Sequence, residues 1–314
     1  MHTRRLVKSG ASSYTVSLPK EWLERNKLKR GNMVYIKEKS PGELSISPES
    51  VEEPLKAREI TINVDDKELG TIEREITSAY VNNYNTIRIT GSTLIDKTKD
   101  IRRILHNFTA LEITEQRAER IVAKDLLNLK EVSIETSIRR MDMIIRSMMQ
   151  DIGSIRNKSI LENIQFRDFD VNKLYFLLFR LIKGALNDPV LAGHFDIDSE
   201  KALSVWYLAV NLENIADCCK SICLNLTRVG EEYDLAEFEE LYKKVMGYYF
   251  DVMKAYYKKD KKLADNVALN RNGVIDRCVL LSEKNKGFEM LNLWGSLKEI
   301  ENLICNIGRI VIDG

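Results

Sequence analysis

The stretch "WYLAVNLENIADCCKSI" (residues 206–222) has a counterpart near the end of the chain, "WGSLKEIENLICNIGRI" (residues 294–310). In both stretches the apolar residues are spaced by three and four, which buries one face of a helix. At one constant offset the identities are Trp206 with Trp294, Glu213 with Glu301, Asn214 with Asn302 and Ile222 with Ile310. Because the identities and the apolar stripes agree at the same offset, we infer a duplicated helical unit.

The rest of the chain after Glu131 shows the same helical spacing. The first stripe is Ile134, Ile138, Met141, Ile145, Met148, Ile152 and Ile155, and the last is Met290, Leu293, Leu297, Ile300, Ile304, Ile307 and Val311. With a helix around residues 263–283, the pattern predicts six helices. Helices that each bury one face pack as a bundle. We therefore expect two tandem three-helix bundles over residues 131–314.

The section before these helices alternates between strand and helix patterns. "EITINV" and "NTIRIT" read as strands, "LGTIEREITSAYV" and "IDKTKDIRRILHNF" as helices, and "LEITEQ" with "AERIVAK" as a terminal hairpin. This order predicts a small βαβαββ sandwich over residues 56–127. The segment "SPGELSISPESVEEP" (40–54), rich in Pro, Ser and Glu, reads as the exit from the first module into a linker.

The first fifty residues form a third pattern, "SSYTVSLPKEWLERNKLKRGNMVYIKEK" (12–39). A strand ends at Pro19, whose fixed φ suits the start of a helix, and Gly31 supplies a turn before a second strand. About fifty residues bury too little surface for a stable monomer. The chain is therefore expected to be an α+β multidomain protein with domains at 1–50, 56–127 and 131–314.

Composition limits the protein class. The densest apolar run, "LYFLLFRLI" (174–182), is too short for a membrane span and contains Arg180, so we expect no membrane insertion. No apolar segment follows the basic residues of "MHTRRLVKSG", which argues against a secretory signal. The five cysteines are an odd number, and three of them crowd residues 218–223. This is not a disulfide framework, and it favours a cytoplasmic location.

Charge is unevenly distributed along the chain. The formal net charge is +1, yet residues 1–50 hold ten basic and five acidic side chains. A basic module on a mildly acidic body suggests a polyanionic partner. An ordinary solvated basic surface is the alternative.

Glu213 and Asp217 are the candidate ligating residues. They are four residues apart, so they share one helix face at the edge of the apolar stripe, and they repel each other unless a positive charge lies nearby. Oxygen ligands at this spacing suit a divalent cation. The alternative is a solvated flank paired with Lys220 or with an arginine of another helix. In the second copy, Glu301 is kept and Cys305 stands at the aspartate position.

Other chemistry is not indicated. Cys219 and Cys223 have a metal-like separation, but they fall on the apolar stripe and are read as buried hydrophobes. The sequence shows no nucleophile–base pattern, no phosphate-binding glycine loop and no histidine cluster. We therefore do not expect an enzyme.

The segment "LENIADCCKSI" resembles the Glu-x-x-x-Asp helix motif of the PhoU family, a tandem pair of three-helix bundles that regulates phosphate uptake. The resemblance covers residues 131–314. It implies a bound divalent or trivalent metal ion held by Glu213, Asp217 and Glu301. Cys305 departs from the motif, which puts the second site in doubt.

The segment "YTVSLPKEWLERNKLKRGNMVYIKE" resembles the AbrB/SpoVT family. That resemblance implies a homodimer through residues 1–50, in which hairpins of two chains close one swapped-hairpin β-barrel that binds DNA. The residues implied in DNA binding are Arg4, Arg5, Lys8, Lys20, Lys29 and Arg30. The loop "SGASSYT" lacks the basic residue usual there, and "KEWLERN" replaces a pair of arginines. The alternative is therefore a barrel that serves only dimerisation and does not bind DNA.

The order of the three sections resembles the archaeal-type phosphate uptake regulators. The resemblance implies a cytoplasmic, homodimeric, DNA-binding regulator of phosphate homeostasis with a metal-binding sensor domain. A phosphate transporter or signalling component is the implied second partner. The alternative is an adaptor that restrains a phosphate transporter through protein contacts, with the barrel used only to dimerise.

Overall fold

A computed structural model describes residues 3–10, 13–40, 42–48, 58–153, 158–230, 233–284 and 287–314. The chain divides into two compact units, Met1–Ala57 and Arg58–Gly314, which are treated separately below. Within the described residues, no helix is both long and apolar enough to span a membrane. The division into three domains at 1–50, 56–127 and 131–314 stays a prediction.

The N-terminal unit consists of two hairpins and one short helix. Pro19 is the N-cap residue of the helix, and Gly31 adopts a φ of +94°, so both residues occupy the places that the sequence predicts. The hairpins are separate two-stranded antiparallel sheets in the described residues. The closed barrel, which needs a second chain, stays a prediction. The elements are β1 (Val7–Lys8), β2 (Tyr14–Thr15), α1 (Lys20–Arg25), β3 (Tyr35–Ser40) and β4 (Glu43–Ser47).

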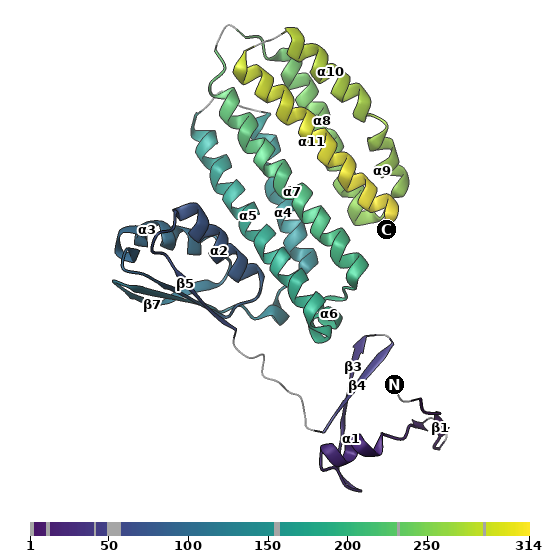
Figure 1. Cartoon of the computed structure of the whole chain (residues 1–314). Helices are drawn as coiled ribbons and strands as arrows, with labels where there is room; N and C mark the ends of the chain where they lie inside the picture. Colours follow the sequence, from purple (N-terminus) through teal and green to yellow (C-terminus); the bar gives the residue numbers. More distant parts are fainter. Residues whose placement is uncertain are drawn as a thin grey trace. The chain divides into compact units, whose positions relative to one another are not determined.

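The second unit begins with a four-stranded sheet, in which the strand order is β5-β6-β8-β7. Strands β5 and β6 are parallel, and the other neighbours are antiparallel. The two helices of this section, α2 and α3, lie on one face of the sheet, where the apolar strand residues are buried (Figure 1). The predicted order of strands and helices is confirmed. The elements are β5 (Glu59–Asn63), α2 (Leu69–Val81), β6 (Thr86–Thr90), α3 (Leu94–Leu105), β7 (Leu111–Arg117) and β8 (Arg120–Asp125).

The remainder of this unit is helical. The described residues hold eight helices rather than the six predicted. A short helix follows α5, where Asp188 caps its first turn and Pro189 opens it. The helices are α4 (Ile134–Ile152), α5 (Lys158–Asn187), α6 (Pro189–Phe195), α7 (Ser199–Leu226), α8 (Ala236–Lys258), α9 (Lys261–Ala268), α10 (Arg271–Lys284) and α11 (Phe288–Asp313).

The helix predicted over 263–283 is wrong as a single element, because it breaks between α9 and α10. At the break, the Asn270 amide donates to the carbonyl of Asn266 at 2.8 Å, and Asn272 and Gly273 lie in the first turn of α10. Asparagine competes for backbone groups, and both residue types have low helix propensity. The sequence therefore favours an interruption at this point.

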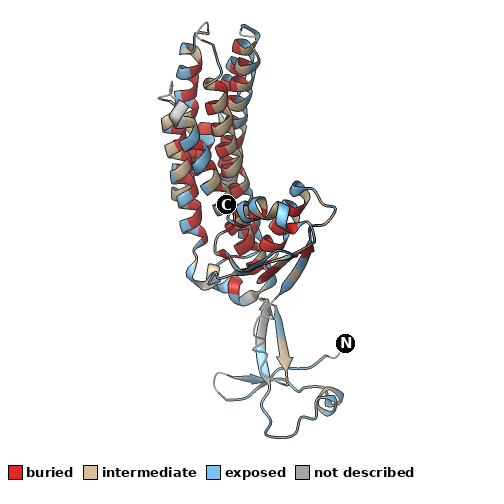
Figure 2. Cartoon of the chain, turned by 90° about the vertical axis from the view of Figure 1, so that its left-hand side faces the viewer, coloured by how far each residue is buried: buried red, intermediate tan, exposed pale blue. Residues whose placement is uncertain are grey.

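The buried stripes lie where the sequence places them, along the inner faces of the long helices (Figure 2). Ile155 of the first stripe lies outside the described residues. Helix α7 packs against α4 and α5, and α11 packs against α8, α9 and α10. The two long helices α7 and α11 also contact each other and run antiparallel. Their polar contacts are Asn211 with Asn306, Ser221 with Ser296 and Asn225 with Asn292.

Candidate functional site

The six candidate DNA-binding residues are all exposed in the N-terminal unit. Lys8 lies in β1, with the other two N-terminal candidates just before it, and Lys20 opens α1. Lys20 also approaches Glu24 at 3.6 Å, in a pair that solvent screens. The last two candidates share the turn that follows α1. The full set is Arg4, Arg5, Lys8, Lys20, Lys29 and Arg30. All six side chains are therefore accessible to solvent.

The described part of the same unit has no buried core. Among the side chains described in residues 3–48, none is buried. Five large apolar side chains are between 63% and 74% exposed, namely Leu6, Tyr14, Met33, Ile36 and Leu44. Large apolar side chains are therefore exposed on this unit when one chain is taken alone.

The predicted carboxylates of α7 meet a third carboxylate from α5. The ammonium of Lys220 donates to Asp217 Oδ1 at 2.5 Å and to Asp168 Oδ2 at 2.7 Å. Asp168 has a nearly buried side chain, whereas Asp217 is 47% exposed. Glu213 lies one helical turn before Asp217 and interacts electrostatically with both aspartates. The four side chains therefore form one charged cluster between the two helices.

The electrostatics of this cluster are dominated by burial and mutual repulsion. Burial, followed by the charges of Asp217 and Asp168, raises the pKa of Glu213 to about 7. Burial also raises the pKa of Asp168. Burial alone would lower the pKa of Lys220, but its hydrogen bonds to Asp168 and Asp217 outweigh this and raise it. Three acidic groups therefore share one ammonium, and burial opposes the ionisation of Glu213 and Asp168.

The donor chemistry of the cluster suits a hard cation, because all three acidic groups offer oxygen. The Lys220 ammonium, however, holds the position between Asp168 and Asp217 that a shared ion would take. Within the described residues, no group of three or more His, Cys, Asp or Glu side chains is arranged around one ion position. The residues thus fit a metal ion by donor chemistry, whereas their described arrangement does not bring three ligands around one position.

Glu301 does not join this cluster. It lies on α11, is fully buried, and neither carboxylate oxygen has a hydrogen-bond partner. Burial raises its pKa to about 7, against the opposing charges of Arg271 and Lys244. The Arg271 guanidinium is bonded instead to Asn302 Oδ1, at 2.8 and 3.1 Å. Cys305, which stands at the aspartate position, is a buried free thiol. Glu301 is thus a lone buried acid on the second long helix.

A shallow groove between α7 and α11 borders the first cluster. Its volume is about 430 Å³, and it is lined by Asp217 and Cys218 on α7 and by Asn292, Ser296 and Glu299 on α11, among others. Burial raises the pKa of the Cys218 thiol to about 12, so this thiol stays protonated and unreactive. The groove gives the cluster access to solvent along the contact between the two long helices.

Asp168 joins the site through tertiary packing and, among the described residues, has no partner nearby in the sequence. It is separated from Lys220 by 52 residues, and the pair forms only when α5 packs on α7. The segment "RDFD" (167–170) offered a weak signal, since Asp168 lies among the apolar residues of α5. Cys219 and Cys223, read as buried hydrophobes, are both fully buried.

Two family models match parts of the chain. Residues 7–53 match MazE, described as an antidote-toxin recognition domain of a bacterial antitoxin. Residues 138–226 match the PhoU domain, which covers most of α4 and all of α5 to α7. No curated protein and no solved structure matches the chain. The chain therefore joins a MazE/AbrB-like N-terminal domain to a PhoU domain.

Proposed function

We propose that the protein is a homodimeric, non-enzymatic, cytoplasmic regulator of phosphate homeostasis. The observation that supports this best is the presence of a MazE/AbrB-like domain and a PhoU domain in one chain. PhoU domains act in the control of phosphate uptake, and the N-terminal domain type suggests binding to DNA or protein together with dimerisation.

The N-terminal domain would bind DNA as a dimer. A two-fold axis doubles the six exposed basic residues of each chain. Such a surface suits phosphate contacts, whose affinity falls steeply with salt because bound counterions are released. The exposed apolar side chains of the same unit supply the surface through which two copies would close.

The helical domain would act as the sensor. An ion bound by Glu213, Asp217 and Asp168 in exchange for Lys220 would add positive charge at the groove between α7 and α11. A bound cation of this kind attracts phosphate or an acidic partner. Glu301 would hold a second ion only with ligands from outside its own helix, because Cys305 stands where the first copy has Asp217.

Fluorescence anisotropy with duplex DNA from the gene's own promoter, over a salt series, tests DNA binding. We expect affinity to fall steeply with salt and to be lost when Arg4, Arg5 and Lys8 are all changed to alanine. The matched control removes three exposed charges from the second unit, at Lys99, Arg103 and Lys298. Equal loss in both triple variants would show only a general charge effect and would contradict a DNA-binding face.

An adaptor function is the second candidate. The N-terminal family model is described as a protein-recognition domain, so protein–protein contacts, here those of the dimer, are an alternative to DNA binding at this unit. In that case the first unit would only dimerise the chain, and the helical domain would contact a phosphate transporter. Absence of DNA binding at low salt, with the dimer intact, would favour the adaptor.

A further inference from the structure

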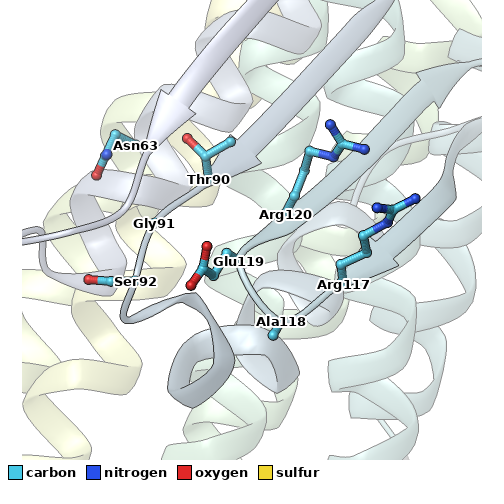
Figure 3. A pocket seen from close by; sticks show the side chains of 8 residues that line it. All are labelled: Asn63, Thr90, Gly91, Ser92, Arg117, Ala118, Glu119 and Arg120. Atoms are coloured by element: carbon cyan, nitrogen blue, oxygen red, sulfur yellow. The ribbon is translucent and has the colours of Figure 1, made fainter.

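The sheet of the second unit carries an open hollow of about 590 Å³ that belongs to neither matched segment. It lies at the carboxyl ends of the parallel strands β5 and β6, beside the turn between β7 and β8 (Figure 3). In open sheets with parallel strands, ligands bind outside these strand ends. Its lining residues are Asn63, Thr90, Gly91, Ser92, Arg117, Ala118, Glu119 and Arg120.

One cross-strand row of polar side chains forms the floor of the hollow. Asn63 pairs with Thr90, Thr90 with Arg120, and Arg120 with Arg117. Paired residues share a face of the sheet. Each strand also has a buried isoleucine next to its residue of this row, namely Ile62, Ile89 and Ile121. Because successive side chains of a strand point to opposite faces, the polar row lies on the face away from the helices. The hollow is thus a polar site on the face that α2 and α3 leave open.

The two arginines are incompletely neutralised. Both contact the same carboxylate oxygen of Glu115, at 2.5 Å from Arg120 and 2.8 Å from Arg117. The Nε–H of Arg120 is shielded from solvent and has no hydrogen-bond partner. These charges lower the pKa of Glu115, first through the Arg120 hydrogen bond and then through Arg120, Arg117 and Arg88. One shared oxygen leaves several guanidinium donors of the pair available.

The opposite rim of the hollow is the loop that follows β6, and Asp65 packs against this loop at Gly91. Asp65 accepts from the backbone N–H groups of Ser92 and Thr93 at 3.1 and 2.9 Å, so the amides that precede α3 are already bound. Gly91 has a φ of +155°, and a Cβ there would lie 2.7 Å from Asp65 Oδ1. The backbone of this rim is therefore closely packed, and the basic side chains that line the hollow are Arg117 and Arg120.

We propose that this hollow binds a phosphoryl group, held by Arg117 and Arg120 with the hydroxyl of Thr90. Guanidinium pairs match the geometry of phosphate oxygens and form charge-assisted hydrogen bonds with them. The same chemistry serves inorganic phosphate and the phosphate of a nucleotide. Glu119 lines the hollow next to the arginines; its carboxylate opposes a free anion but can accept from the hydroxyls of a nucleoside. This site is independent of the carboxylate cluster on α5 and α7.

Isothermal titration calorimetry on the full-length protein, with EDTA present, tests the proposal with two probes, inorganic phosphate and adenosine monophosphate. We expect saturable binding of one ligand per chain. Arg117→Gln and Arg120→Gln should each weaken it about tenfold or more, since each removes charge-assisted hydrogen bonds. Arg103→Gln is the matched control, an exposed arginine of α3 outside the hollow. Asp217→Ala should leave this binding unchanged, which separates it from the helical cluster.

Glu119→Gln should change the affinity for inorganic phosphate in the opposite direction. A gain in affinity cannot be explained by misfolding, so this variant complements the two arginine variants. It removes a like charge, so inorganic phosphate should bind more tightly. If the ligand is a nucleotide, the same variant should weaken adenosine monophosphate, because a carboxylate acceptor is lost. Absence of saturable binding by both probes overturns the proposal. Binding that Arg117→Gln and Arg120→Gln leave unchanged, in variants with wild-type circular dichroism, also overturns it.

Discussion

Arg180 on α5 forms a buried bidentate ion pair with Asp125 at the end of β8. Nη1 lies 3.0 Å from Oδ1, Nη2 contacts Oδ2, and the two side chains are 1% and 4% exposed. Nε donates to Asn83 Oδ1 at 3.0 Å, and the guanidinium stacks 4.7 Å from the ring centroid of Tyr80. Arg180 of the helical part is therefore bound by side chains of the preceding sheet and helices. These contacts join the two hydrophobic cores of the second unit.

Breaking this pair should strongly destabilise the second unit. Asp125→Asn leaves a buried guanidinium without its charge partner, and such losses cost about 3–5 kcal/mol. Chemical denaturation followed by circular dichroism measures the change in the free energy of unfolding. The matched control is Asp100→Asn, which breaks an exposed pair with Arg103 and should change stability by less than about 1 kcal/mol. Equal small effects in both variants would contradict a structural role for Arg180.

The sequence predicted the periodic features of the fold and missed its long-range polar pairs. Helical stripes such as Ile138 to Ile145 were predicted correctly, because burial of one face repeats locally along the chain. In the sequence, Arg180 is a single charge within the apolar run of residues 174–182. Its partner lies 55 residues earlier, and no local spacing indicates which charges meet after packing.

The candidate carboxylate site shows the same limit. Glu213 and Asp217 share a helix face, so their spacing alone brings them together. The Lys220 contact with Asp217 is also local, and the sequence raised it as the alternative to a metal ion. Asp168 depends on how α5 packs against α7. The lone, unpartnered state of Glu301 depends on the surroundings of α11 in the same way.

Lys220→Met should strengthen metal binding at the helical cluster. The substitution removes the ammonium between Asp168 and Asp217 and keeps most of the apolar stem, so three carboxylates are left with no local cation. Titration of the metal-free protein with Mg²⁺ and Mn²⁺, followed by calorimetry, measures the affinity. We expect an increase of about tenfold, on the order of one lost competing charge interaction.

Asp217→Ala provides the opposite control for the same cluster. It should reduce bound metal sharply while leaving Lys220 bonded to Asp168. If metal content is unchanged in Asp217→Ala, and Lys220→Met does not raise affinity, the cluster is an ion-pair network that joins α5 to α7 and has no ion-binding role.

Glu301→Gln should stabilise the protein above neutral pH when chelator is present. The raised pKa of about 7 means that the native state resists ionisation, whereas the unfolded state ionises near pH 4.5. The destabilisation therefore grows as pH rises from about 4.5 and levels off above 7. A shift of this size corresponds to at most about 3 kcal/mol. Thermal unfolding of both proteins between pH 5 and 8 should show a widening gap.

Added divalent metal separates the two roles of Glu301. If this acid ligates an ion, Mn²⁺ should raise the unfolding temperature of the wild type more than that of Glu301→Gln. Glu299→Gln, at an exposed position on the same helix, is the matched control. A gap that stays constant with pH would contradict the buried, ionisable state described for Glu301.

Leu44→Glu should dissociate the dimer that residues 1–50 are proposed to form. Leu44 is 66% exposed on β4 in the isolated chain, and a charge buried in an apolar interface is costly. Light scattering coupled to gel filtration should show the mass falling to that of one chain. Leu269→Glu is the control, since Leu269 is 75% exposed on the second unit. A wild-type protein that is already monomeric at micromolar concentration would contradict the proposed dimer.

Asp65→Asn should reduce the dependence of stability on acidic pH. Hydrogen bonds from the backbone of Thr93 and Ser92 lower the pKa of Asp65 from 3.8 to about 2. A lowered pKa means that the carboxylate stabilises the native state above pH 4 and that this contribution is lost as pH falls towards 2. The difference in unfolding temperature between wild type and Asp65→Asn should therefore be full at pH 5 and shrink steadily below pH 4. Asp66→Asn, at the neighbouring exposed position, is the matched control. A wild-type advantage over Asp65→Asn that persists unchanged at pH 2 would show that hydrogen-bond geometry, and not the charge of Asp65, holds the loop between β6 and α3.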